Sequence, residues 1–125
     1  MVVNDMLANG YGRIINISSV NGEKGQFGQA NYSAAKAGMH GFTKAVAQEV
    51  ASKGVTVNTI SPVYIATPMI MEVPEEIREG IRKNIPVGRF GKPEDIARVV
   101  SFLAHEDASF ITGTNVSANG GQYMH

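Results

Sequence analysis

Residues 18–36, Ser-Ser-Val-Asn-Gly-Glu-Lys-Gly-Gln-Phe-Gly-Gln-Ala-Asn-Tyr-Ser-Ala-Ala-Lys, carry the clearest structural signals in this sequence. They follow an isoleucine-rich run, which predicts a buried strand over residues 13–18. The glycine-rich part predicts a loop over residues 19–30. The alanine-rich part opens a pattern of helical period that predicts a long amphipathic helix over residues 31–53. A strand, a loop and a helix in this order indicate an α/β fold.

Ser19, Tyr32 and Lys36 bring a hydroxyl, a phenol and a cation into this segment. Ser19 closes the predicted strand, where a side chain faces the crevice at the carboxyl end of a parallel sheet. Tyr32 and Lys36 are four residues apart, so a helix places them on one face with Cβ atoms about 5–6 Å apart. An ammonium beside a phenol eases release of the phenolic proton, which suits proton transfer to a carbonyl oxygen. Ser19 can donate a hydrogen bond to the same oxygen.

The remaining pattern predicts two further strands and three further helices. The strands are expected over residues 55–60 and 113–118, and the helices over residues 2–9, from Pro74 and from Pro93. Glu75 and Glu76 follow Pro74 and are interpreted as ordinary first-turn acids rather than as an acid–base pair. His40 is interpreted as a packing or solvated residue, because no second ligand stands at metal-like spacing, and no metal site is expected.

Taken together, these motifs resemble the short-chain dehydrogenase/reductase family. The matching segments, in order, are residues 12–19, 31–38, 57–62, 86–97, 111–113 and 119–121. The resemblance implies the C-terminal half of a doubly wound parallel-sheet (Rossmann-like) α/β fold, with three strands and flanking helices. Within the family the loops are most similar to the acetoacetyl-CoA reductases, and next to the enzymes that reduce 3-oxoacyl-acyl-carrier-protein.

The resemblance also implies a reaction, in which a 3-oxoacyl thioester is reduced to the 3-hydroxyacyl form with NADPH. Ser19, Tyr32 and Lys36 would be catalytic, with Tyr32 as the general acid. The cofactor would be bound by Tyr32, Lys36, Pro62, Val63, Ile65 and Thr67. The substrate would be bound by Ser19, Gln26, Phe27, Gln29 and Tyr64. Val63 stands where the family usually has glycine, so we expect its backbone and side chain to hinder the approach of the nicotinamide.

The sequence has 125 residues, about half of what a doubly wound dinucleotide-binding enzyme uses. We therefore expect residues 1–125 to form a single unit that lacks the N-terminal half, which binds the dinucleotide phosphates in this family. No Gly-x-Gly-x-x-Gly follows a predicted strand. Two hypotheses stay open: the catalytic half of an enzyme, or a non-catalytic remnant or oligomerising module that is inactive alone. The sequence also leaves open whether the cofactor is NADPH or NADH, and whether the substrate is a thioester of CoA or of the acyl carrier protein.

Composition adds expectations about partners. Eleven basic residues balance eleven acidic ones and 43% of residues are hydrophobic, so nothing indicates binding to nucleic acid or to a membrane. The absence of cysteine fits a reducing, cytoplasmic location. Small residues on the predicted long helix allow close approach of another backbone, and in the family this helix packs against a second copy. A homo-oligomer is therefore expected.

Overall fold

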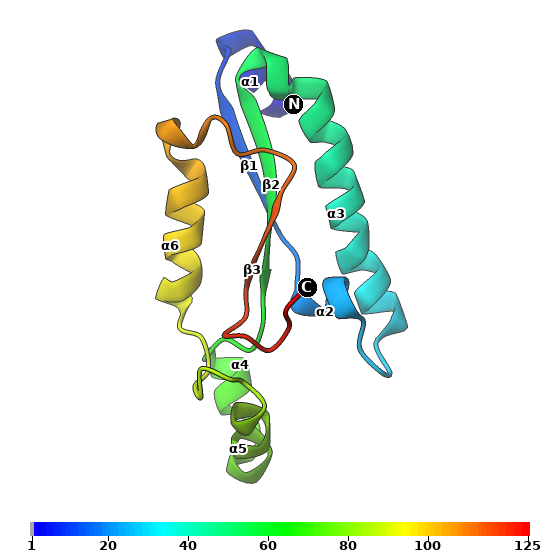
Figure 1. Cartoon of the computed structure of the whole chain (residues 1–125), viewed down its shortest axis with the longest axis vertical. Helices are drawn as coiled ribbons and strands as arrows, with labels where there is room; N and C mark the ends of the chain where they lie inside the picture. The colour runs from blue at the N-terminus through cyan, green and yellow to red at the C-terminus, as the bar shows by residue number, and fades with distance from the viewer. Residues whose placement is uncertain (1) are drawn as a thin grey trace.

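Three parallel strands form one sheet in this computed structural model, which describes residues 2–125 (Figure 1). The strands are β1 (Gly12–Ile17), β2 (Val55–Pro62) and β3 (Asn115–Ala118). The order is β1-β2-β3, so β2 lies in the centre and each outer strand has one unpaired edge within the described residues. The predicted α/β class with three strands and flanking helices is confirmed.

Two helical layers cover the sheet. One face carries α1 (Val2–Asn9) and the long α3 (Ala30–Val50), which continues into the short 3-10 turn η1 (Ala51–Lys53). The other carries α6 (Pro93–Ala104), followed by η2 (Glu106–Ala108), and Figure 1 shows α3 and α6 on opposite sides of the strands. The predicted 31–53 helix is thus confirmed, and Gly54 ends it in the left-handed conformation (φ 76°).

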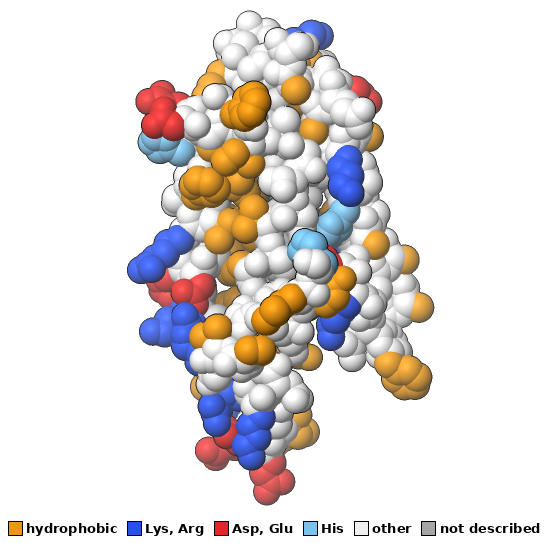
Figure 2. Space-filling view, in the orientation of Figure 1, with side chains coloured by type: hydrophobic (Ala, Val, Ile, Leu, Met, Phe, Trp, Pro, Cys, Tyr) orange, Lys and Arg blue, Asp and Glu red, His pale blue; other side chains and the backbone are white. Residues whose placement is uncertain are grey.

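The core follows from alternation along β2. Val55 and Val57 point toward α3 and pack with Ala47 and Val50, while Ile60 has the opposite parity along the strand and points toward α6. Because helices cover β2 on both faces, it is buried almost throughout, as is typical of a central parallel strand. Figure 2 shows hydrophobic side chains gathered between α6 and the sheet, and charged side chains along the outer side of α6 and at the end of the molecule formed by α5.

The predicted loop over residues 19–30 is corrected by the structure. It contains a short helix, α2 (Val20–Lys24), which begins at the N-cap Ser19 and ends at Gly25. The Ser19 side chain accepts a hydrogen bond from the Asn21 backbone amide, and this bond stabilises the first turn. The sequence lacks the apolar period of a longer helix here, so the prediction missed it.

Two helices lie beyond the carboxyl ends of the strands, α4 (Pro68–Met71) and α5 (Glu75–Lys83) (Figure 1). The first was not predicted. The second begins one residue later than expected, because Pro74 is its N-cap rather than its first residue. Glu75 and Glu76 lie exposed in its first turn, as expected. No helix among residues 2–125 is both long and apolar enough to cross a membrane.

Candidate active site

A pocket of about 270 Å³ opens at the carboxyl ends of β1 and β2. It is lined by Ser19, Val20, Asn21, Tyr32, Val63, Tyr64, Ile65, Thr67 and Ile70. The structure therefore brings together two of the predicted catalytic residues, Ser19 and Tyr32. Three of the predicted cofactor contacts, Val63, Ile65 and Thr67, line the same pocket. The volume lies near the lower end for small-molecule sites, so the pocket suits the reacting ends of ligands rather than a whole dinucleotide.

Ser19 presents its hydroxyl from the N-cap of α2. Its Oγ accepts a hydrogen bond from the Asn21 backbone amide at 3.2 Å. Since the oxygen acts as an acceptor in this bond, its own hydrogen is left to donate. A donor hydroxyl at the rim of a pocket can stabilise negative charge that develops on a bound oxygen.

Tyr32 and Lys36 occupy successive turns of α3, on one face as predicted. The Tyr32 side chain is 43% exposed at the pocket, and the Lys36 Nζ lies 5.7 Å from the centre of its ring. Nζ also donates a hydrogen bond to the Ile17 carbonyl at 3.0 Å. The last residue of β1 thus holds the ammonium beside the phenol.

His40 has a defined partner, which sequence reasoning missed. Its Nε2 lies 2.9 Å from the Ser18 Oγ, which itself donates to the Lys36 carbonyl at 2.8 Å. Because the Ser18 hydrogen is used in that second bond, His40 is the donor in the first. Burial lowers the pKa of His40; the nearby Glu23 opposes this, and Lys44 adds to it.

The predicted substrate-binding residues divide into two groups. Ser19 and Tyr64 line the pocket, and the Tyr64 ring meets Phe90 edge-on with centroids 6.5 Å apart. The other three lie outside the pocket lining: Phe27 is fully exposed, as is typical of a loop tip, and Gln29 accepts a hydrogen bond from the Asn21 side chain at 3.0 Å. Gln26 is also exposed.

The segment over residues 62–67 is fixed by the neighbouring loop. The Gly91 amide donates to the Tyr64 carbonyl at 3.0 Å, and the Ala66 amide donates to the Gly91 carbonyl at 2.8 Å. No non-glycine residue among residues 2–125 has a positive φ, so the backbone at Val63 is not in the left-handed region that favours glycine. The backbone conformation at this position therefore does not itself require glycine. The side chain can still hinder the approach of the nicotinamide, because Val63 lines the pocket.

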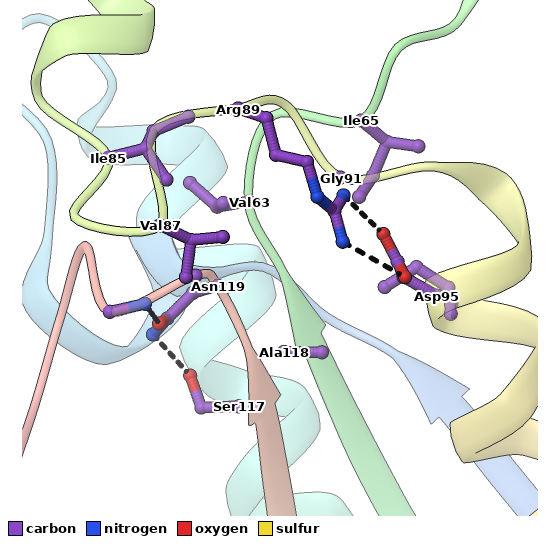
Figure 3. Close-up of a pocket in the computed structure, with 13 residues that line it drawn as sticks. Val63, Ile65, Ile85, Val87, Arg89, Gly91, Asp95, Ser117, Ala118 and Asn119 are labelled. Carbon is purple, nitrogen blue, oxygen red and sulfur yellow. Dashed lines mark hydrogen bonds and ion pairs between the residues drawn. The ribbon is translucent and has the colours of Figure 1, made fainter.

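A second cavity of about 310 Å³ lies beside this pocket and shares Val63 and Ile65 with it (Figure 3). Arg89 and Asp95 form an ion pair at 2.7 Å on its wall. Arg89, together with the Lys92 backbone amide, lowers the pKa of Asp95 from 3.8 to about 2. Arg89 is thus engaged in holding the loop to α6. Among residues 2–125, no three His, Asp or Glu side chains are grouped to hold a metal ion.

Comparison with known proteins gives consistent results. A family model described as enoyl-(acyl carrier protein) reductase matches residues 1–123. An acetoacetyl-CoA reductase of Allochromatium vinosum is 59% identical over 120 residues, which are 96% of this chain and 49% of the relative. An acetoacetyl-CoA reductase of Rhizobium meliloti is 64% identical over 116 residues, 92% of this chain and 48% of the relative.

A third relative is a 3-oxoacyl-(acyl-carrier-protein) reductase of Pseudomonas aeruginosa. It is 54% identical over 114 residues, which are 91% of this chain and 46% of the relative. The chain therefore spans about half the length of the relatives it matches.

Proposed function

The chain belongs to the short-chain dehydrogenase/reductase family, and from this premise we propose that residues 1–125 form the catalytic half of a reductase. The proposed reaction converts a 3-oxoacyl thioester, with acetoacetyl-CoA as the first candidate, to the 3-hydroxyacyl thioester with NADPH. The observation that carries the proposal is the convergence of Ser19 and Tyr32 on one pocket, with Lys36 beside the phenol. The relatives named acetoacetyl-CoA reductase support the choice of substrate.

In this proposal each polar side chain has one task. The Tyr32 hydroxyl gives its proton to the substrate carbonyl oxygen. The Ser19 hydroxyl donates a hydrogen bond to the same oxygen while negative charge develops there. The Lys36 ammonium, fixed by the Ile17 carbonyl, stabilises the phenolate that remains on Tyr32.

A nicotinamide group would lie against residues 62–67, and when bound it supplies the hydride that the carbonyl carbon receives. Pro62, Val63, Ile65 and Thr67 are the proposed contacts on this side, with Tyr32 and Lys36 opposite. The pocket is large enough only for the reacting ends of the cofactor and the substrate.

The second candidate substrate is a 3-oxoacyl-acyl-carrier-protein. It is supported by the relative from Pseudomonas aeruginosa. Both substrates present the same carbonyl to Tyr32, so they differ only in what lies beyond the thioester. Gln26, Phe27 and Gln29 are the proposed contacts for that part, since they stand exposed on the loop beside the pocket.

A hybrid protein tests the proposal. It joins the N-terminal half of the Allochromatium vinosum relative to residues 1–125, and NADPH oxidation is followed with each of the two substrates. We expect turnover of acetoacetyl-CoA. Tyr32→Phe should lower kcat by about 10²- to 10⁴-fold, because it removes general acid catalysis, and should leave the Kd of NADPH nearly unchanged.

Tyr123→Phe is the matched control, since this phenol lies in the C-terminal tail and lines neither cavity. Its kcat should equal that of the unsubstituted hybrid. Full activity of Tyr32→Phe would show that another group is the acid. A folded hybrid that binds NADPH but reduces neither thioester would favour the non-catalytic interpretation.

A further inference from the structure

Glu23 connects α2 to the far strand of the sheet. Its carboxylate accepts hydrogen bonds from the Asn115 side-chain amide and from the Ser117 hydroxyl, the latter at 2.8 Å. Both donors belong to β3, whereas Glu23 is only four residues after the N-cap Ser19. A half-buried carboxylate with two hydrogen bonds is a strong anchor, because bonds to charged groups are stronger than neutral ones.

The same network continues to β2. The Ser61 hydroxyl, which is fully buried, donates to the Asn115 side-chain oxygen at 2.8 Å. Ser61 directly precedes the 62–67 segment. Two sides of the candidate active-site pocket are therefore joined through Glu23 and Asn115, which do not line it: Ser19 with α2, and the segment over residues 62–67.

This connection matters because α2 has only five residues. Helices shorter than about 12 residues are marginal in water, so α2 depends on its tertiary contacts. One is the buried side chain of Val20. Another is Gly22, where a Cβ atom would lie 2.8 Å from the Lys36 carbonyl carbon, so α2 rests directly on the α3 backbone. Glu23 is the charged contact, and it holds the side of α2 that faces β3.

We infer that Glu23 is a positioning residue for the reaction: it fixes α2, and with it the Ser19 hydroxyl, at a set distance from the 62–67 segment. The inference rests on the proposed function. Glu23 itself lines neither the pocket nor the neighbouring cavity. Its effect on the reacting oxygen is therefore exerted through the placement of Ser19, rather than by contact.

The direction of each hydrogen bond determines which substitutions are informative. Since Ser61 donates to the Asn115 oxygen, the Asn115 amide nitrogen must face Glu23, which requires an acceptor there. Glu23→Gln keeps that acceptor and the side-chain length. Glu23→Leu keeps the approximate volume but removes both acceptors, so the donors of Asn115 and Ser117 lose their partner. Glu49→Leu is the control, because Glu49 is an exposed carboxylate on α3.

The first measurement is amide hydrogen exchange of the 125-residue chain. Glu23→Leu should accelerate exchange of the amides of α2 by about tenfold or more, because two hydrogen bonds to a charged group are lost. Amides of β2 should exchange as before. Glu23→Gln should resemble the unsubstituted chain more than Glu23→Leu does, and Glu49→Leu should show no change in α2.

The second measurement is kinetic and uses the hybrid protein. Glu23→Leu should lower kcat by up to about 100-fold, as expected when a catalytic group is displaced, with the KM for NADPH nearly unchanged. Glu23→Gln should recover most of the loss. Unchanged α2 exchange in Glu23→Leu would overturn the role of Glu23, and so would faster exchange across β2 with normal activity per folded molecule. An inactive unsubstituted hybrid would instead overturn the proposed function, so the two failures are distinguishable.

Discussion

The Lys36 ammonium lies 5.7 Å from the centre of the Tyr32 ring while it donates a 3.0 Å hydrogen bond to the carbonyl of Ile17. A flexible side chain is thus fixed at one end of β1, with its charge beside the phenol. Lys36→Met keeps most of the length and removes the charge. In the hybrid protein we expect kcat to fall by about 100-fold or more, since electrostatic stabilisation of the phenolate is lost.

Lys53→Met is the control for this substitution, because Lys53 is an exposed lysine in the η1 turn at the far end of α3. Steady-state kinetics with acetoacetyl-CoA provide the measurement. If both variants keep full activity, the ammonium of Lys36 has no part in the reaction.

Gly22 and Gly38 make a matched pair for the contact between α2 and α3. A Cβ at position 22 would lie 2.8 Å from the Lys36 carbonyl carbon, whereas a Cβ at Gly38 would meet nothing within 4 Å. Gly22→Ala should lower the free energy of unfolding by about 1–3 kcal/mol, because the helices must separate. Gly38→Ala should raise it by up to about 1 kcal/mol through helix propensity. Urea denaturation measures both, and equal effects would refute the close contact.

Asp95 should make stability depend on pH in the acidic range. Its carboxylate accepts hydrogen bonds from Arg89 and from the Lys92 amide, and its pKa is lowered from 3.8 to about 2. Because the folded value is the lower one, this stabilisation is present above about pH 4 and is lost as the pH falls from about 4 to 2. Asp95→Asn should destabilise the chain at pH 7 and flatten the decline between pH 4 and 2.

Urea midpoints at pH 7, 4 and 3 provide the measurement for Asp95. Asp5→Asn serves as control, since Asp5 is an exposed carboxylate on α1. A pH profile of Asp95→Asn that superimposes on that of the unsubstituted chain would contradict the assignment.

Self-association is expected through the exposed side of α3. Small residues face outward there, namely Ala34, Ala35, Gly38, Gly41 and Ala45. Phe42 lies among them and is 58% exposed, which is a large apolar side chain in contact with water. We expect dimers or larger species in sedimentation at micromolar concentration, and Phe42→Glu should shift them toward monomer. Gln48→Glu adds the same charge on this helix as a control; a monomeric unsubstituted chain would refute the expectation.

The strands and the long helix could be predicted because their signals are local. β-Branched runs indicated the strands, and the i, i+4 spacing placed Tyr32 and Lys36 on one face. The missed features depend on contacts between distant segments. Glu23 meets β3 across 92 and 94 positions of the chain, which is one of the contacts that hold the short α2. A single sequence carries no periodic signal for a pairing of this kind.

The backbone at Val63 illustrates a similar limit. The departure from the family glycine was visible in the sequence, and φ is not positive at any non-glycine residue among residues 2–125, so the conformation at Val63 is not one reserved for glycine. The sequence alone does not tell whether a glycine is needed for its backbone conformation or for the close approach of a ligand. Here the conformation is accessible to valine, and only the approach remains affected by the side chain.

Val63→Gly therefore tests how much the valine side chain hinders the cofactor. Val63 lines the pocket on the 62–67 segment, against which the nicotinamide is proposed to bind. Overlap with one or two methyl groups costs about 1–3 kcal/mol, so their removal should tighten NADPH binding to the hybrid protein by about fivefold or more. The added backbone freedom of glycine opposes this by at most about 1 kcal/mol. Val63→Ala separates the two effects, because it removes the methyl groups without the extra freedom, and it should bind at least as tightly as Val63→Gly. Fluorescence titration with NADPH measures each Kd, and equal affinity in all three proteins would show that valine at this position does not hinder the cofactor.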